Sequence, residues 1–252
     1  MMLITRREGK SLKRYGHLST GNYNPRTARL YTDISHITGD VALTTDMEHV
    51  FVHLASQSKL PRLSKLWMAP FYLHKKLVAK INAIGQAAAQ GRPARIVAKM
   101  NSLTDEDLIR SLIAAGQQGV QIDLIVRGAC MLPAQVPGHT ENIRVRSIIG
   151  RFLEHSRVFY FRDGEEEDLY LSSADWMNRN MVRRVELAWP VTDPVQRQRL
   201  IDECLVAYLH DSVDAWELGA DGSYQRIGLH TKGPHHGAQA ALMDRYMRND
   251  HR

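Results

Sequence analysis

The sequence has only two cysteines among its 252 residues, Cys130 and Cys204, and they lie far apart. Their spacing matches no disulfide framework or zinc site, so we interpret both as buried thiols of a reducing compartment. No apolar run approaches the ~18 residues that a membrane span needs, and no charged segment followed by an apolar one opens the chain. The sequence therefore predicts a cytoplasmic protein, or one peripheral to the membrane, with no transmembrane segment.

The charge balance is basic, with a formal net charge of +6 and a pI of about 9.4. A basic protein attracts polyanions, and nucleic acid is the usual partner of such a chain. However, no RNP, zinc-finger or helix-turn-helix pattern is present, and the basic residues are scattered rather than clustered in a stripe. The sequence therefore favours a phosphate-rich partner and predicts no nucleic acid.

Strand and helix patterns alternate along the chain, which is typical of a mixed α/β fold. Predicted strands cover residues 1–6, 13–19, 29–37, 66–69, 94–100, 120–126, 143–147, 158–161, 169–172 and 184–189. Predicted helices cover 40–54, 70–91, 105–117 and 194–210, the third with Thr104 as its cap. The polar stretch 57–64 predicts a linker. We therefore expect domains at 1–60 and 65–215, followed by a loosely ordered tail at 219–252 that ends in a short helix.

The stretch RFLEHSRVFYFRDGEEEDLYLSSADWMNRN carries the most chemistry. It places His155 and Arg157 two residues apart on one strand pattern, and Ser172, Ser173 and Asp175 in a turn one hairpin later. An imidazole, a fixed cation and a hydroxyl-rich turn are what phosphoryl transfer needs, because the ring carries or donates to a phosphoryl group while the others hold its oxygens. A strand with a surface histidine and an ordinary serine turn is the alternative.

An internal repeat favours the chemical interpretation. The segment LSTGNYNPR, from Leu18, aligns with LSSADWMNR, from Leu171, and further along the chain Asp33 aligns with Glu186. Two similar half-sites predict a pseudo-twofold pair of domains with one composite site between them. In the same alignment, the counterpart of His155 falls at about Met2, where the sequence has no histidine.

Five segments carry distinctive motifs: RYGHLSTGNYNPRTARLYTD, PARIVAKMNSLTD, GVQIDLIVRGACML, ENIRVRSIIGRFLEHSRVFYF and LYLSSADWMNRN. Together they resemble the C-terminal part of the first class of polyphosphate kinase. The resemblance implies two phospholipase D-like domains with mixed sheets flanked by helices, the first of them incomplete. In the family, a His-x-Lys motif upstream of the first turn carries the phosphorylated histidine, at the place where this chain has Met1 and Met2. The resemblance therefore implies a fragment that is inactive alone.

The resemblance also assigns nucleotide contacts. Arg127, in LIVRG, follows a buried strand pattern, where sites of open α/β sheets lie, and it matches a family position that contacts the nucleotide phosphates. Tyr31, in LYTD, matches a nucleotide-contacting tyrosine. From the residues alone, a surface ion pair for Arg127 and a half-buried strand aromatic for Tyr31 remain open.

The implied activity is the reversible transfer of the ATP γ-phosphate to inorganic polyphosphate through a phosphohistidine, with Mg²⁺ offsetting phosphate charge and ADP as the other product. The family further implies a homo-oligomer. In this scheme His155 acts as acid, base or phosphate ligand, and Arg157 holds phosphate oxygens. Ser172, Ser173 and Asp175 position the ring. Two alternatives remain, a phospholipase D-like phosphodiester hydrolase and a non-catalytic module that binds ATP or polyphosphate.

Overall fold

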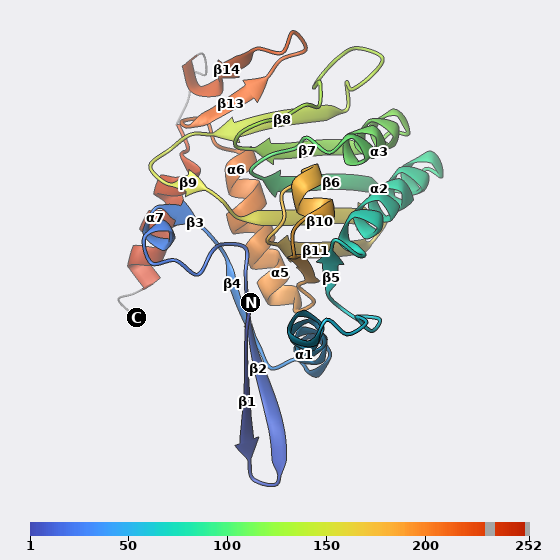
Figure 1. Ribbon diagram of the computed structural model, residues 1–252. Helices are drawn as coiled ribbons and strands as arrows, with labels where there is room; N and C mark the ends of the chain where they lie inside the picture. The colour runs from blue at the N-terminus through green and yellow to red at the C-terminus, as the bar shows by residue number, and fades with distance from the viewer. Residues whose placement is uncertain (230–234, 250–252) are drawn as a thin grey trace.

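The computed structural model describes residues 1–229 and 235–249, and its largest element is a mixed sheet (Figure 1). The strand order is β14-β13-β8-β7-β6-β10-β11-β12-β5, and the inner pairs β6·β7 and β7·β8 are parallel while the other pairs are antiparallel. The strands are β5 (Trp67–Ala69), β6 (Ala94–Met100), β7 (Gln121–Val126), β8 (Ile143–Ile148), β10 (Arg157–Asp163), β11 (Glu166–Ser172), β12 (Glu186–Pro190), β13 (Ala215–Leu218) and β14 (Tyr224–Arg226).

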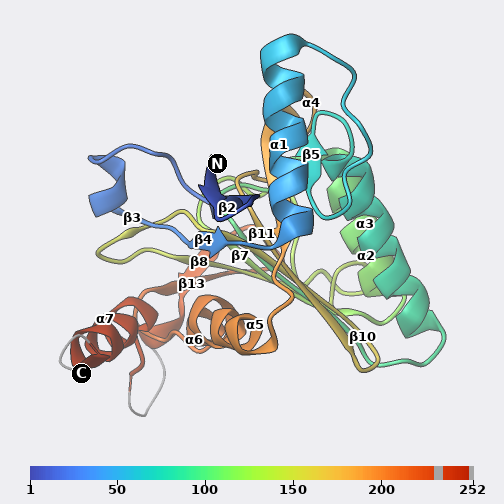
Figure 2. The same cartoon turned by 90° about the horizontal axis from the view of Figure 1, so that it is seen from below.

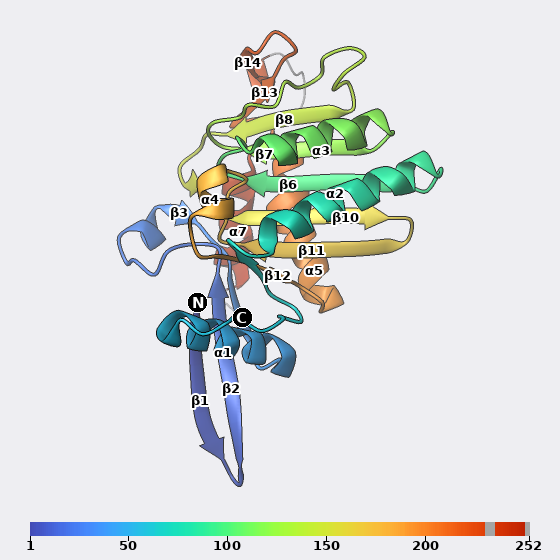
Figure 3. The same cartoon turned by 45° about the vertical axis from the view of Figure 1, so that its right-hand side comes forward.

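Helices cover both faces of this sheet. Helices α2 (Leu73–Ala89) and α3 (Glu106–Gln117) lie across one face (Figure 3), and α5 (Pro194–Ile201), a π-helical turn at Asp202–Val206 and α6 (Ala207–Leu209) lie across the other (Figure 2). The apolar face predicted for α2 is the buried one, since Leu73, Leu77, Ile81 and Ile84 are all at most 1% exposed. The mixed α/β prediction is confirmed.

The N-terminal segment forms a smaller sheet of order β1-β2-β4, whose hairpin extends away from the body (Figure 1). Its strands are β1 (Met2–Glu8), β2 (Ser11–Ser19) and β4 (Ser35–Thr38), and helix α1 (Val41–Ser56) packs on them. Leu18, Met47 and Val50 from this segment join the core of the large sheet's α5 side. The N-terminal segment and the large sheet therefore share one hydrophobic core.

The predicted strand 29–37 is interrupted. A 3-10 turn at Thr27–Arg29 precedes the short strand β3 (Tyr31–Thr32), which leaves the small sheet and pairs in parallel with β9 (Leu153–Glu154). The chain then returns to the small sheet as β4. The break lies at Asp33, whose carboxylate accepts a hydrogen bond from the Thr20 hydroxyl. Side-chain chemistry thus overrides the local strand propensity.

Two other local predictions differ from the structure. Helix α3 is capped by Asp105, whose carboxylate accepts the Leu108 N–H at 3.1 Å, rather than by Thr104. The tail contains β14, a 3-10 turn at Ile227–Leu229 and the helix α7 (Ala238–Asn249), although part of it, residues 230–234 and 250–252, lies outside the described residues. The remaining short helix is α4 (Asn178–Val182). No described helix has the length and apolar character needed to cross a bilayer.

The predicted linker 57–64 is fastened to the body. Leu60 and Leu63 are each 7% exposed. The buried carboxylate of Asp46 on α1 accepts the backbone N–H groups of Ser64, Lys65 and Leu66, at 3.0, 2.6 and 2.9 Å. One carboxylate therefore sets where the chain enters β5, and the domain boundary at this stretch stays a prediction.

Replacing Asp46 with alanine should lower the free energy of unfolding by about 3 kcal/mol, because it leaves three backbone N–H donors without an acceptor, the Leu66 donor being buried and the Lys65 donor partly buried. Urea denaturation measures the loss. Glu106→Ala removes a carboxylate that is 76% exposed and should change stability by less than about 0.5 kcal/mol. Equal stabilities of the two variants would contradict a fastened linker.

Candidate active site

The two turns of the predicted repeat make the same hydrogen bonds. In the first, the Gly21 N–H donates to Ser19 Oγ at 3.1 Å, and the Thr20 hydroxyl donates to Asp33 Oδ1 at 2.9 Å and accepts the next N–H, from Ile34, at 3.0 Å. An added Cβ at Gly21 would lie 2.0 Å from Asp33 Oδ2, so a larger residue here would displace the carboxylate. The turn therefore holds the Asp33 carboxylate against the end of β2.

The second turn repeats this pattern position by position. The Ala174 N–H donates to Ser172 Oγ at 3.0 Å, the Ser173 hydroxyl donates to Glu186 Oε2 at 2.5 Å, and the Leu187 N–H donates to Ser173 Oγ at 3.1 Å. The Ser172 hydroxyl also donates to the Leu187 carbonyl and is fully buried. Both serine hydroxyls thus serve the fold and position Glu186, and their role as phosphate ligands stays a prediction.

His155 lies where the two halves meet. Its Nδ1 is 2.9 and 3.1 Å from the carboxylate oxygens of Asp33, which comes from the other half. The ring of Tyr31 lies beside the imidazole, with centroids 4.8 Å apart. The side chains of His155 and Asp33 are 12% and 20% exposed. In the neutral tautomer that donates its Nδ1 proton to Asp33, Nε2 carries the lone pair and lies 3.3 Å from Nη1 of Arg157.

The buried Arg157 side chain makes hydrogen bonds to both halves of the repeat. Its Nε and Nη2 donate to the two oxygens of Asp175 at 3.1 and 3.0 Å, and Nη1 donates to the Thr20 carbonyl at 2.9 Å. Nη1 also lies 3.2 Å from Nδ1 of His155. Both partners of the ion pair are 6% exposed. The guanidinium is therefore held in place beside the imidazole.

The turn carboxylate expected to orient His155 was Asp175, and the structure gives that contact to Asp33 instead. Asp175 lies on the other side of Arg157 and accepts the Asn101 backbone N–H at 2.7 Å. Burial raises the pKa of Asp175, but the hydrogen bonds and charge of Arg157 outweigh it and hold the pKa below its ordinary value. The alignment of Asp33 with Glu186 was the sequence signal for the orienting acid.

Arg127 follows β7, as predicted. Its backbone N–H donates to the Met100 carbonyl. Arg127 lines, together with Glu154 and Ser156, a small cavity that has no room for a water molecule. The guanidinium makes no hydrogen bond to any residue that the structure describes, and its contact with a ligand stays a prediction.

Lys99 and Glu154 are a pair that the sequence analysis missed. Lys99 alternates with Asn101 on one strand, a pattern that fits a site-facing pair no better than a solvated face, and the structure shows Lys99 buried and 2.6 Å from the Glu154 carboxylate. Burial raises the pKa of Glu154, yet Lys99 and the hydrogen bonds to the carboxylate lower it overall. The one signal in the sequence was the position of Glu154, directly before His155.

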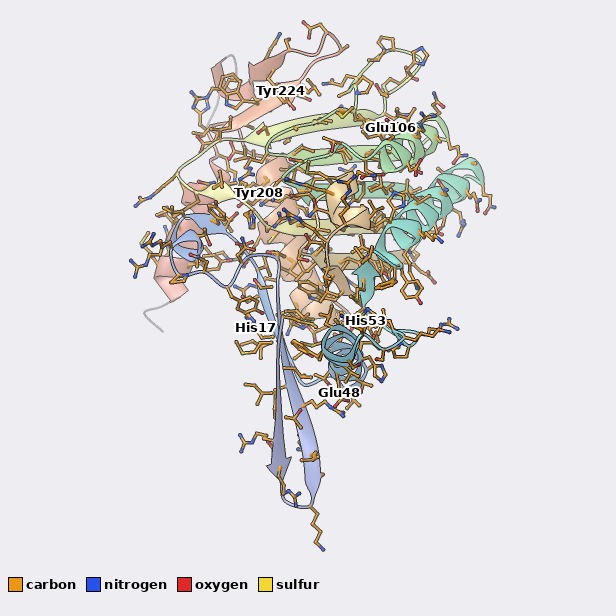
Figure 4. The ribbon with its side chains drawn as sticks, viewed as in Figure 1. His17, Glu48, His53, Glu106, Tyr208 and Tyr224 are labelled. Atoms are coloured by element: carbon orange, nitrogen blue, oxygen red, sulfur yellow. The ribbon has the colours of Figure 1, made fainter. Side chains whose placement is uncertain are left out.

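Other histidines lie apart from this group. His17 stands at the base of the hairpin (Figure 4), where its Nδ1 is 2.7 Å from the Tyr23 hydroxyl. His74 Nε2 contacts Asp105, the cap of α3, at 2.9 Å and lies 4.0 Å from Asp107. Because Asp105 caps α3, its place beside His74 needs no bound ligand, and we assign none to this group.

A resident magnesium ion does not fit the residues at the turns. Mg²⁺ prefers oxygen ligands and is usually held by one or two carboxylates together with substrate phosphates. The three carboxylates of the described site, Asp33, Asp175 and Glu186, already accept hydrogen bonds from side chains or backbone. We therefore assign no resident ion to these turns.

Comparison with known proteins identifies the chain. The model described as Polyphosphate kinase C-terminal domain 2 matches residues 66–239, and that described as Polyphosphate kinase C-terminal domain 1 matches residues 1–60. The chain belongs to the polyphosphate kinase family. A polyphosphate kinase of Xylella fastidiosa (strain Temecula1) is 48% identical over 244 residues, and one of Pseudomonas aeruginosa (strain PAO1) is 52% identical over 245.

These matches cover 97% of this chain but 35% of each polyphosphate kinase, so the chain spans about a third of the length of its curated relatives. The crystal structure of polyphosphate kinase from Porphyromonas gingivalis superposes with a TM-score of 0.89 at 34% identity, covering 98% of this chain and 38% of that one. The family predicted from the motifs is confirmed, and the fold agrees with it.

Replacing Arg157 with leucine should cost about 3–5 kcal/mol of stability at pH 7, because Asp175 is left buried and charged without its partner. Asp175 has a lowered pKa in the folded protein, so the pair's contribution is present above the ordinary pKa of 3.8 and is lost as pH falls below it. The stability difference between wild type and variant should therefore shrink as pH falls below 3.8.

Urea denaturation at pH 7 and at several lower pH values measures this difference. Arg110→Leu removes a guanidinium that is 77% exposed, and it should show neither the loss nor the pH dependence. A stability difference for Arg157→Leu that stays constant with pH would mean that the ion pair does not hold the turn.

Proposed function

We propose that this chain supplies the second histidine and the phosphate-holding residues of an enzyme that reversibly transfers the ATP γ-phosphate to inorganic polyphosphate. The observation that carries the proposal is the His155–Asp33 contact beside the buried Arg157. Membership in the polyphosphate kinase family supports the reaction class, while the contacts support the roles of the individual residues.

In this mechanism the carboxylate of Asp33 keeps the proton on Nδ1 of His155, so that Nε2 gives or takes a proton at a phosphate oxygen. Arg157 adds a fixed positive charge next to the ring and is itself held by Asp175 and Thr20. Arg127 binds phosphate oxygens with its two-pronged guanidinium. Tyr31 packs on the imidazole and presents its ring to the nucleotide.

The phosphorylated histidine of this scheme comes from the first half of the repeat. In the register of the large sheet Arg157 pairs with Ser172, the counterpart of Ser19. In the small sheet Met2 pairs with His17, so the position opposite Ser19 falls ahead of Met1, and the counterpart of His155 falls further ahead. We infer that Glu186 receives that ring, as Asp33 receives His155.

The chain incubated alone with γ-labelled ATP and magnesium should acquire no acid-labile, base-stable label, because neither His17 nor His155 is the nucleophile in this scheme. The same chain extended at its N-terminus by a His-x-Lys segment from a longer relative should acquire it. A matched extension with Gln-x-Lys should not. Label on His17 or His155 of the unextended chain at turnover-competent rates would refute the assignment.

Arg127→Lys should weaken ATP binding roughly ten- to a hundredfold, since lysine keeps the charge but lacks the fork that makes a charge-assisted pair worth about 1.5–3 kcal/mol. Isothermal titration with MgATP measures the change. Arg144→Lys, an exposed position on β8, is the matched control and should bind like wild type. Unchanged affinity in a folded Arg127→Lys protein would assign Arg127 a structural role.

A further inference from the structure

His155 lies between β9 and β10 rather than on one strand with Arg157, and the C-terminal helix α7 reaches the segment before it through one side chain, Gln239, which is 5% exposed. Its Oε1 accepts the Phe152 N–H at 2.9 Å, and its Nε2 donates to the Phe152 carbonyl at 2.9 Å and to Glu154 Oε1 at 2.6 Å. Gly150 leaves the room for this approach, since an added Cβ there would lie 2.6 Å from Gln239 Oε1. The amide Nε2 of the side chain thus donates to Glu154 on β9 and to Phe152 directly before it.

Helix α7 is itself fixed at its start. The Ala238 N–H donates to Asp211 Oδ2 at 2.7 Å, and Asp211 is 2% exposed. The Ser212 N–H donates to the His236 carbonyl at 2.8 Å, and the His236 N–H donates to the Ser212 hydroxyl at 3.0 Å. These bonds join the segment before α7 to the turn after α6. Gln239 therefore contacts β9 from an anchored position.

Glu154 connects this contact to the interior. One oxygen accepts from Gln239, and the other accepts from the Lys99 ammonium at 2.6 Å and from the Thr32 hydroxyl at 2.8 Å. The Lys99 ammonium also lies 3.5 Å from the centroid of the Tyr208 ring, which is labelled in Figure 4. A buried carboxylate with this many donors has one position, so Glu154 fixes the side chains around it.

Thr32 and Glu154 are the residues next to Asp33 and His155. They face each other in the β3·β9 pair, and the His155 N–H is 3.3 Å from the Thr32 hydroxyl. Each of these strands has two residues, so its backbone hydrogen bonds alone hold the register weakly. The side-chain cluster around Glu154 supplies the missing constraint.

We propose that Gln239 is a positioning residue, which holds Glu154 and Thr32 in register and thereby keeps the Asp33 carboxylate on the imidazole of His155. The proposal deepens the proposed function, because the positioned pair is the acid–base unit of that mechanism. It assigns α7 a catalytic purpose although the helix does not itself touch the ring.

The test is the ring Nδ1 proton of His155 in ¹⁵N-edited spectra of the 252-residue chain. A proton shared with Asp33 is shielded from solvent and visible, and its signal is assigned by its absence in His155→Gln. Gln239→Ala should lose this signal while the far-UV circular dichroism stays that of wild type. Asp244→Ala, an exposed position on the same helix, should keep it. Persistence of the signal in a folded Gln239→Ala protein would overturn the proposal.

Gln239→Glu is a second variant that preserves the shape of the side chain and replaces its two N–H donors with a carboxylate oxygen. It should lose the signal as well, since a carboxylate facing Glu154 repels it. Retention of the signal in a folded Gln239→Glu protein would also overturn the proposal.

ATP titration separates this proposal from the function on which it rests. Gln239→Ala should bind MgATP about tenfold more weakly than Asp244→Ala, because losing the positioning that one hydrogen bond supplies, worth about 1.4 kcal/mol, is tenfold in affinity. If the wild-type chain does not bind ATP, the proposed function fails, and the ring-proton signal alone decides the positioning role.

Discussion

The burial of the Arg157 guanidinium is the constraint on which the arrangement of the site depends. A buried cation is tolerated only when its donors are satisfied, because its desolvation costs several kcal/mol. Asp175 satisfies two donors from the same half of the repeat, and the Thr20 carbonyl satisfies a third from the other half. The two turns can therefore approach each other in one geometry, and that geometry places the imidazole of His155 against the Asp33 carboxylate.

One carboxylate crosses between the halves. Asp33 follows the first turn but contacts the histidine of the second half, whereas Glu186, its counterpart, is held by Ser173 and Asn180 at 2.5 and 2.7 Å. Each turn holds its own acid in the same hydrogen-bond pattern, so the placement of both acids follows from the repeat. The His155–Asp33 contact therefore needs residues of both halves.

Much of this fold could be predicted from sequence, since strands such as Ala94–Met100 and the apolar stripe of α2 follow from local periodicity. The repeat likewise located both turns. What could not be predicted depends on partners distant in sequence. Lysine is usually solvated, and Lys99 is buried only because the fold brings Glu154 and Tyr208 to it. The strand pattern at residues 29–37 is broken at Asp33 because the Asp33 carboxylate bonds to Thr20. The contact of Gln239 with Glu154 spans 85 positions and has no local signature.

Strand β6, in the middle of the large sheet, positions both buried carboxylates of the site, Glu154 and Asp175. It pairs with β10 so that Lys99 lies opposite Val158, on the face where Glu154 receives its ammonium. Directly after the strand, the Asn101 N–H holds Asp175 and so the Arg157 pair. A slip of one residue between β6 and β10 would turn Lys99 to the opposite face and leave Glu154 buried and unpaired. The register of one central strand pair is thus enforced by two buried carboxylates, and the same carboxylates fix the segment 154–157, which carries His155 and the guanidinium beside it.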